Sequence, residues 1–401
     1  MTFQKDTIII KTNVKGNIIE IHLLYMQKAF ILQLSRIFIE RCIADAPETL
    51  SVLSRFSLPV FPVDDPREVY TWVSAGRDPV QRGKEVLFLC RNRGPFIRNC
   101  PGTRYYLCCG YMILHVGTFC SMDCAYCILQ SYFHPPVLQY FVNHGDMLAE
   151  LDRALQQKAG RRFGTGEYTD SLIWEYKTDL SRLLVPRFAK QSYAMLELKS
   201  KTVAVENLKG MDHQKKTALS WSVNTEDIIR SNERGTASLT ARLKAAARCE
   251  SWGYPLSFHF DPIIIYPGCE NDYEKVVNAI FAHVSADSIL WISLGTFRFM
   301  PDLKGIVRKR FPDSKIIYGE FISGLDGKMR YFKPLRVDIY RRIVRRIREI
   351  APQVPLYFCM EDEAVWEKVM GFVPDENSGG LAGMLDRSAI AHCGLDKNRE
   401  K

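Results

Sequence analysis

Apolar and polar residues form two kinds of pattern along this chain, one typical of strands and one typical of helices, and the two alternate. Short runs rich in Val, Ile, Leu and Phe predict buried strands, whereas an apolar residue at every third or fourth position predicts an amphipathic helix. From residue 111 onward, each predicted strand is followed by a helical pattern. The six strands are expected at Tyr111–Val116, Arg162–Gly166, Ala194–Lys199, Ala218–Val223, Leu256–Phe260 and Ile289–Leu294.

Helices are expected between and after these strands. The first starts near Asp146, and the others are expected at Leu172–Tyr176, Val203–Leu208, Thr225–Ser231, Ser238–Trp252, Tyr273–Val284 and Asp302–Arg310. Six β/α units are too few for a closed eight-stranded barrel. The pattern therefore predicts an α/β fold built on an open, partial (β/α)6 barrel.

Shorter α/β patterns flank the barrel on both sides. The N-terminal one is expected to contain Ile37–Glu40 (strand), Glu48–Arg55 (helix), Pro59–Val63 (strand) and Val86–Cys90 (strand). The C-terminal one is expected to contain Arg336–Ile350 (helix), Pro355–Cys359 (strand) and Glu361–Met370 (helix), followed by a short terminal helix after the break at Asn377–Gly380. The barrel is thus expected to carry a small N-terminal α/β layer and a C-terminal α/β extension.

These patterns divide the chain into four parts. The first part has no clear signal beyond a hairpin-like pair at Thr7–Lys11 and Ile18–His22. The expected parts are a poorly defined N-terminal segment at 1–34, an N-terminal α/β subdomain at 35–110, the barrel at 111–312 and the C-terminal extension at 313–401.

Composition and charge restrict the setting in which the protein works. With 47% hydrophobic and 25% charged residues, the chain resembles an ordinary globular protein. Charged residues interrupt the apolar stretch Ile18–Phe38, and the N-terminus has no export signal, so we expect a cytoplasmic location and no membrane partner. The net charge of +9 is compatible with a polyanionic partner. The arginines of helix Arg336–Ile350 are interpreted as a solvated outer face rather than a phosphate-binding surface.

Potential metal-binding residues are concentrated in the loop Gly117–Gln130, directly after the first barrel strand. It contains the pattern Cys-x-x-x-Cys-x-x-Cys, with a tyrosine before the last cysteine; the residues are Cys120, Cys124, Tyr126 and Cys127. Three thiolates can ligate three irons of a four-iron cluster and leave the fourth iron open for chemistry. A zinc site with His115 or His134 as fourth ligand is the alternative.

Nine further cysteines bring the total to twelve. A disulfide framework is not expected in a chain of this length without an export signal. Cys90, Cys100, Cys108 and Cys109 precede the loop with a spacing that matches no cluster pattern, so we interpret them as buried free thiols. A second cluster at these positions is the alternative.

Polar or glycine-rich residues follow every predicted barrel strand. In parallel β/α folds the carboxyl ends of the strands meet at one edge, where active sites are found. The cysteine loop, Gly166–Ser171, Lys199–Thr202, Asn224–Glu226, His259–Pro262 and Gly295–Arg298 are therefore expected to converge.

The cysteine spacing resembles that of the radical S-adenosylmethionine (SAM) superfamily, and further segments resemble the spore photoproduct lyases and their relatives. These segments are Ser222–Glu226, Gly235–Leu243, Gly253–Leu256 and Asp261–Ile263. The resemblance implies a [4Fe-4S] cluster, SAM as cosubstrate, and a 5′-deoxyadenosyl radical that abstracts hydrogen from the substrate. It also implies an electron donor such as a flavodoxin or ferredoxin. In the lyases proper the substrate is the methylene-bridged thymine dimer of ultraviolet-damaged spore DNA.

The resemblance assigns expected roles to individual residues. It makes Cys120, Cys124 and Cys127 the cluster ligands. It places Gly166 and Glu167 at the methionyl amine, and Lys201, or alternatively Lys199, at the methionyl carboxylate. It places Ser222 and Asn224 at the ribose or carboxylate, although helix or turn capping would equally explain these two residues.

The sequence departs from the lyases at two points. Lyases carry a cysteine just before Thr-Ser-Asp after the second strand, which returns hydrogen to the product, but Gly166–Asp170 here contains none. The lyases also carry a tyrosine directly after the last cluster cysteine, where this chain has Ile128, although Tyr126 is retained. Tyr168 or Cys269 could donate hydrogen instead, and Arg330 and Tyr331 could contact the substrate.

We therefore expect a radical SAM enzyme of the spore photoproduct lyase-like family, acting on an unidentified substrate that could be DNA. One alternative is a non-catalytic iron–sulfur or zinc protein that binds nucleic acid. The other is a thymine-dimer repair lyase with a rewired hydrogen-atom relay.

Overall fold

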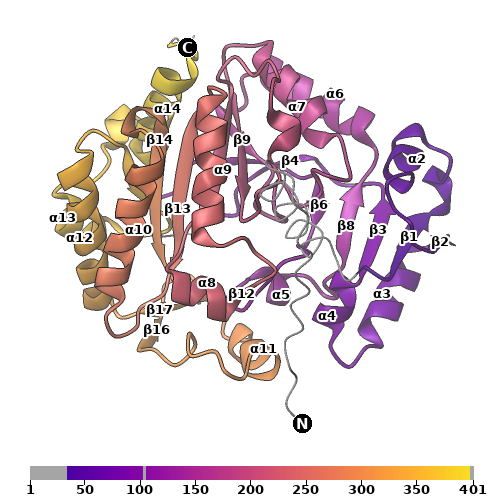
Figure 1. The fold of residues 1–401 in the computed structure, drawn as a ribbon, viewed down its shortest axis with the longest axis horizontal. Helices are drawn as coiled ribbons and strands as arrows, with labels where there is room; N and C mark the ends of the chain where they lie inside the picture. Colours follow the sequence, from indigo (N-terminus) through magenta and orange to yellow (C-terminus); the bar gives the residue numbers. More distant parts are fainter. Residues whose placement is uncertain (1–33, 103–104, 398–401) are drawn as a thin grey trace, which may run out of the picture.

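The computed structural model describes residues 34–102 and 105–397 (Figure 1). The hairpin predicted at Thr7–Lys11 and Ile18–His22 lies outside the described residues. Two large sheets organise the described chain, a five-stranded one in the N-terminal part and an eight-stranded one after it. None of the helices in the described segments combines the length and apolarity needed to cross a bilayer.

The eight-stranded sheet is the predicted open barrel. Its strands, in spatial order, are β18 (Leu356–Phe358), β14 (Ile289–Thr296), β13 (Leu256–Ile263), β11 (Thr217–Ser222), β10 (Met195–Ser200), β9 (Arg162–Gly164), β5 (Met112–Leu114) and β4 (Ile97–Asn99). All six predicted strands are present and parallel to one another. Strand β18 adds a seventh parallel strand beside β14, and β4 pairs antiparallel to β5. The assignment of an α/β fold with a partial barrel is therefore confirmed.

Helices cover the barrel in the expected order. They are α6 (His144–Gln156), α7 (Leu180–Ala189), α8 (Glu226–Asn232), α9 (Leu239–Ser251), α10 (Cys269–His283), α11 (Leu303–Arg310), α12 (Lys333–Ile350), α13 (Glu363–Met370) and α14 (Gly380–Cys393), with a short 3-10 turn at Glu206–Leu208. Figure 1 shows α9 and α10 along one face of the sheet.

One helix was predicted wrongly. Leu172–Tyr176 forms a series of turns, and the helix begins only at Leu180. The apolar spacing of this segment buries Leu172 and Trp174 without a regular helix. Its start is held instead by bonds to other groups, because the amide of Leu172 donates to Asp170 Oδ1 at 3.0 Å and that of Ser171 donates to Lys199 O at 3.1 Å.

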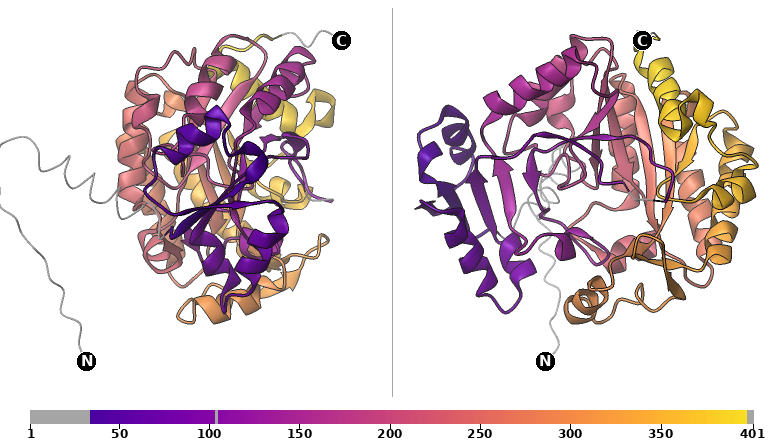
Figure 2. Two further views of the ribbon diagram at one scale, coloured as in Figure 1. Left: turned by 90° about the vertical axis from the view of Figure 1, so that its right-hand side faces the viewer. Right: turned by 180° about the vertical axis from the view of Figure 1, so that it is seen from behind.

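The N-terminal layer is also present, and its sheet contains two strands that were not predicted, the last two in the spatial order. The strand order is β2 (Val60–Val63), β1 (Arg36–Glu40), β3 (Val86–Cys90), β8 (Leu138–Phe141) and β6 (Gly117–Thr118), with α2 (Pro47–Leu53), α3 (Pro66–Ser74) and α4 (Pro79–Lys84) between them. Strands β6 and β8 both belong to this sheet, and the three cysteines lie between them. The short segment between β5 and β6 connects the two sheets. The N-terminal layer and helices α12–α14 lie at opposite ends of the molecule (Figure 2). The domain boundaries at 34, 110 and 312 stay a prediction.

The cysteine loop is fastened to the far side of the barrel by a short ribbon. Strand β7 (Asp123–Cys124) pairs antiparallel with β12 (Glu233–Arg234), which follows α8. The amide of Ala125 also donates to Asn232 O at 2.8 Å. The loop, which comes from the first barrel strand, is therefore attached to the segment after the fourth.

A buried ion pair lies under this ribbon. Arg242 of α9 pairs with Glu233, and the two side chains are 0% and 1% exposed. Arg242 also donates to Ser222 O at 2.8 Å and to Ala237 O at 2.9 Å, and the Tyr126 hydroxyl donates to Glu233. Burial alone would raise the pKa of Glu233, but Arg242 and Lys201 outweigh it and lower the pKa, so Glu233 is ionised.

We predict that Arg242→Met destabilises the protein far more than the matched change Arg248→Met on the same helix. Losing Arg242 leaves an uncompensated buried carboxylate, which costs about 3–5 kcal/mol. Arg248 forms a half-exposed pair with Glu206, so its loss should cost at most about 1 kcal/mol. Urea unfolding of both variants at pH 7 measures the difference. Equal losses would contradict a central role for the buried pair.

Candidate active site

The backbone of the cysteine loop is held by Lys84, the last residue of α4. Its ammonium donates to the carbonyl of Cys120 at 2.8 Å and lies 4.1 Å from the centre of the Phe119 ring. Phe119 is fully buried and has a left-handed backbone (φ 67°), and its amide donates to Tyr168 O at 2.8 Å. Such a conformation costs free energy in a non-glycine residue and persists only where packing enforces it. The first cysteine is therefore held in a fixed place.

The three loop cysteines fit a group that takes three thiolates. Cys120 and Cys124 are buried and Cys127 is partly exposed, and Cys127 lies near enough to raise the pKa of both other thiols. Across the described residues, no three His, Cys, Asp or Glu side chains are gathered around a single metal ion. A group held by these three thiolates would keep one coordination position without a protein ligand.

Burial keeps two of these thiols, those of Cys120 and Cys124, protonated before metal binds. It raises the pKa of Cys120 to about 12 and that of Cys124 well above its usual value, although the charge of Lys201 opposes the second shift. Because a thiol must lose its proton to bind metal, loading the loop releases protons to the solvent.

Lys201, predicted for the methionyl carboxylate, faces the cysteine loop. Its ammonium lies 5.6 Å from the centre of the Tyr126 ring, and its charge acts on Cys124 and Glu233. Asp170 orients this segment, because its carboxylate accepts from Lys201 N at 2.9 Å and from Ser200 Oγ at 2.8 Å. These bonds hold the end of β10 against the segment that follows β9.

Gly166, Glu167 and Lys199 lie together on the neighbouring side. A Cβ atom on Gly166 would stand 3.2 Å from both the Cβ and the carbonyl oxygen of Lys199, closer than most real contacts. Burial alone would lower the pKa of Lys199, but Glu167 and Asp261 outweigh it and raise the pKa. The two lysines therefore have different electrostatic partners, Glu167 for Lys199 and the cysteine loop for Lys201.

Ser222 and Asn224 end β11 as expected, and both are buried. The carbonyl of Ser222 accepts from Arg242. The Asn224 amide donates to Pro262 O at 2.9 Å, and its oxygen accepts from the Tyr273 hydroxyl at 2.8 Å. The Asn224 side chain thus joins the ends of β11 and β13, which favours the capping alternative for this residue.

The two tyrosines singled out as catalytic candidates differ in setting. The hydroxyl of Tyr126 is engaged with Glu233 beneath the loop. Tyr168 stacks on Tyr132, with ring centres 6.0 Å apart and planes 20° apart. Tyr132 is 53% exposed, so this pair reaches solvent. Cys269, the alternative hydrogen donor, is fully buried at the start of α10.

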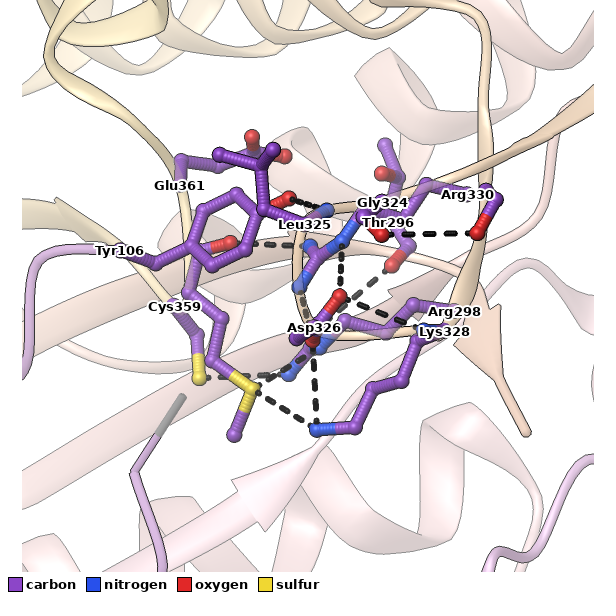
Figure 3. A network of polar contacts seen from close by, with 12 residues as sticks. Tyr106, Thr296, Arg298, Gly324, Leu325, Asp326, Lys328, Arg330, Cys359 and Glu361 are labelled. Carbon is purple, nitrogen blue, oxygen red and sulfur yellow. Dashed lines mark hydrogen bonds and ion pairs between the residues drawn. The ribbon is translucent and has the colours of Figure 1, made fainter. Parts of the chain in front are cut away.

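A cationic network lies at the ends of β14 and β18 (Figure 3). Arg298 binds both carboxylate oxygens of Asp261 at 3.1 Å and donates to Cys359 Sγ at 3.3 Å. Arg330 pairs with Asp326 at 2.7 Å and lies 4.0 Å from the centre of the Tyr106 ring. This network anchors the small sheet of β15 (Arg298–Phe299), β16 (Phe321–Ser323) and β17 (Met329–Tyr331).

Arg330 and Tyr331, expected as substrate contacts, are buried within that small sheet. They are 3% and 2% exposed, and the Tyr331 hydroxyl accepts from Ile265 N at 3.2 Å. Their side chains support the sheet in this structure.

Sequence reasoning missed the residues that hold the loop from a distance. Lys84, Glu233, Arg242 and Arg310 come from four separate elements, and no local pattern marks them. Arg310, at the end of α11, donates to Asp123 Oδ1 at 2.8 Å and to Asp78 Oδ2 at 2.9 Å. No short sequence motif contains both members of any of these pairs, because the paired residues lie 9 to 232 positions apart in the sequence.

Comparisons with known proteins agree with this geometry. The sequence model of the spore photoproduct lyase family matches residues 108–332. The spore photoproduct lyase of Bacillus subtilis is 27% identical over 240 residues, which cover 59% of this chain and 68% of that protein. The enzyme of Clostridium acetobutylicum is 23% identical over 265 residues, covering 64% and 74%.

Solved structures show the same fold. A mutant spore photoproduct lyase superimposes with a TM-score of 0.73 at 20% identity, covering 81% of this chain and 98% of that one. Another mutant, with bound AdoMet and dinucleoside spore photoproduct, gives a TM-score of 0.70 at 20% identity and the same coverage. The family match spans more than half of the chain and contains the whole cysteine loop. This chain therefore belongs to the spore photoproduct lyase family, a family of radical SAM enzymes.

Proposed function

We propose that this chain cleaves SAM reductively and starts radical chemistry on a substrate derived from nucleic acid. The observation that carries the proposal is the cysteine loop itself. It pairs with the segment after the fourth barrel strand, carries three thiols and faces Lys201. A non-catalytic metal protein would not need Lys201 and the carboxylate of Glu167 near a set of three cysteine ligands that lacks a fourth.

Cys120, Cys124 and Cys127 are the residues that would hold the cluster. When bound, a [4Fe-4S] cluster supplies the electron that cleaves SAM to methionine and a 5′-deoxyadenosyl radical, which removes a hydrogen atom from the substrate. Lys84 and the Arg242–Glu233 pair keep the loop in position. Because the site is largely buried, the surrounding protein also limits the access of water to the radical.

Glu167 and Lys201 are proposed to bind the methionyl end of SAM. A carboxylate suits the cationic amine and an ammonium suits the carboxylate, and charge-assisted bonds of this kind are short and strong. Lys201 is favoured over Lys199 because its charge acts on Cys124. Gly166 supports the same site by letting the backbone approach β10. Ser222 remains a candidate ribose contact, whereas Tyr126 and Asn224 are assigned to positioning.

Nucleic acid is the proposed substrate class for two reasons. Related structures hold a dinucleoside spore photoproduct. The chain also carries a net charge of +9, which favours a polyanionic ligand. A ferredoxin or flavodoxin as electron donor and a cytoplasmic location complete the proposal.

Thymine-dimer repair with a rewired relay is the second candidate. Residues 166–170 lack the cysteine of the lyases, but the stacked pair Tyr132–Tyr168 lies beside the loop, since the carbonyl of Tyr168 accepts from Phe119 N at 2.8 Å. Tyr168 is the proposed hydrogen donor in that case.

The proposed function predicts formation of 5′-deoxyadenosine by the anaerobically reconstituted, dithionite-reduced protein in the presence of SAM. The assay is run with and without ultraviolet-irradiated DNA, and chromatography measures the product. Stimulation by irradiated but not by untreated DNA would favour dimer repair. Absence of the product under every condition, despite a full complement of iron, would contradict the proposal.

Cys124→Ala is predicted to lose most of the bound iron, because two remaining thiolates hold a four-iron cluster poorly. Cys249→Ala is the matched control, since Cys249 is a fully buried cysteine of α9 away from the loop. Iron and sulfide analysis after reconstitution compares the two variants. Equal iron contents in the two variants would show that Cys124 is not a cluster ligand.

Glu167→Ala is predicted to keep its iron and to weaken SAM binding at least about tenfold, the effect of losing a charge-assisted bond. Glu167→Gln should fall between this variant and the unmodified protein, since the amide still accepts a hydrogen bond. Equilibrium dialysis with labelled SAM measures the affinity. Unaltered binding by Glu167→Ala would show that Glu167 is a turn residue only.

A further inference from the structure

Helix α11 is strongly basic on its exposed side. Leu303 and Val307 face the core, and Lys304, Arg308 and Lys309 are exposed. The helix contains no acidic residue between Leu303 and Arg310, although Asp302 precedes it and Asp313 follows it. Such a helix presents a cationic stripe to the solvent.

Two cations from other parts of the chain extend this stripe. Arg234 of β12 is 55% exposed, and its guanidinium lies 4.3 Å from the Phe311 ring centre and 3.4 Å from Arg310 O. Lys309 Nζ donates to Arg77 O at 3.2 Å, which brings the exposed Arg77 alongside. We call these residues the α11 surface; it consists of Arg77, Arg234, Lys304, Arg308 and Lys309.

The α11 surface lies directly outside the cysteine loop. Helix α11 packs against α5 (Leu129–Tyr132), which begins two residues after Cys127, and Figure 1 shows α11 beside α5 and β12. Its last residue, the buried Arg310, bonds to Asp123, and Asp123 immediately precedes Cys124. Arg234 of the α11 surface also pairs with Asp123, at 3.8 Å, so two ion pairs connect this region to the residue before a proposed cluster ligand.

We propose that the α11 surface docks an acidic one-electron carrier protein of the ferredoxin or flavodoxin class. The inference rests on the proposed function, in which each SAM cleavage consumes one electron. The carrier is oxidised by one electron and the loop-bound group is reduced by one, so the transfer balances. Opposite charges steer such a pair together and orient it, and transfer requires the carrier to approach the loop closely.

A second basic region argues for the specificity of this location. Helix α12 carries exposed Arg341 and Arg345, but it packs against α10 and α13 at the other end of the barrel sheet (Figures 1 and 2). Arg345 is already neutralised by Glu274 and Glu349. Both helices thus expose arginine side chains, but α12 lies farther from the loop, and the equal change of net charge in its variant makes it the control.

The test compares Arg308→Glu/Lys309→Glu with Arg341→Glu/Arg345→Glu, which change the net charge equally. Formation of 5′-deoxyadenosine is measured against the concentration of reduced flavodoxin and, in parallel, with dithionite as reductant. The α11 variant should lose about tenfold in flavodoxin-driven rate below saturation, with a weaker salt dependence, and keep its dithionite-driven rate. The α12 variant should match the unmodified protein in both assays.

Equal flavodoxin-driven rates in the two variants would overturn the docking site and leave the proposed function intact, provided that dithionite still supports product formation. Binding of oxidised flavodoxin, measured by calorimetry, gives a readout independent of activity and should weaken only in the α11 variant. The same variants are titrated with irradiated duplex DNA. Weakened DNA binding with unchanged flavodoxin binding would identify the α11 surface as a nucleic-acid contact and contradict the proposal.

Discussion

The buried pair of Arg242 and Glu233 is the interaction on which the site depends. Two opposite charges without access to water are stable only when their hydrogen bonds are complete. Arg242 also donates hydrogen bonds to Ser222 O, Ala237 O and Thr236 Oγ1. The glutamate in turn receives the hydroxyl of Tyr126. Through these bonds the helix after the fourth barrel strand determines where the cysteine loop lies, and thus which strand ends surround the proposed cluster.

The interior of the barrel continues this polar arrangement. Glu197 accepts from Ser220 at 2.7 Å and from His259 at 3.0 Å, and His259 in turn contacts Ser293 at 2.7 Å. Burial alone would raise the pKa of Glu197, but His259 outweighs it and lowers the pKa to about 2. A carboxylate ionised this deep in the barrel favours the charged form of Lys199 above it. The open barrel therefore presents alternating charges toward its carboxyl edge, which suits a zwitterionic methionyl group.

The predictable and the unpredictable parts of the structure differ in the range of their interactions. The barrel strands follow from apolar runs bounded by polar residues, and the cysteine loop follows from three residues within eight positions. Both signals are local. The segment predicted as a helix at Leu172–Tyr176 instead forms successive turns, in which Glu175 N donates to Leu172 O at 3.2 Å and Lys177 N donates to Trp174 O at 2.7 Å. The roles of Lys84 and Arg310 could not be predicted from the sequence, because their partners become neighbours only when the sheets assemble.

The central claim is that three cysteines hold a cluster with one iron left for SAM, and electron paramagnetic resonance tests it most directly. The reduced, reconstituted protein is measured before and after SAM is added. The account predicts a changed spectrum, because the amine and carboxylate of SAM would alter the coordination of the open iron. A spectrum typical of a four-iron cluster that does not respond to SAM would contradict it.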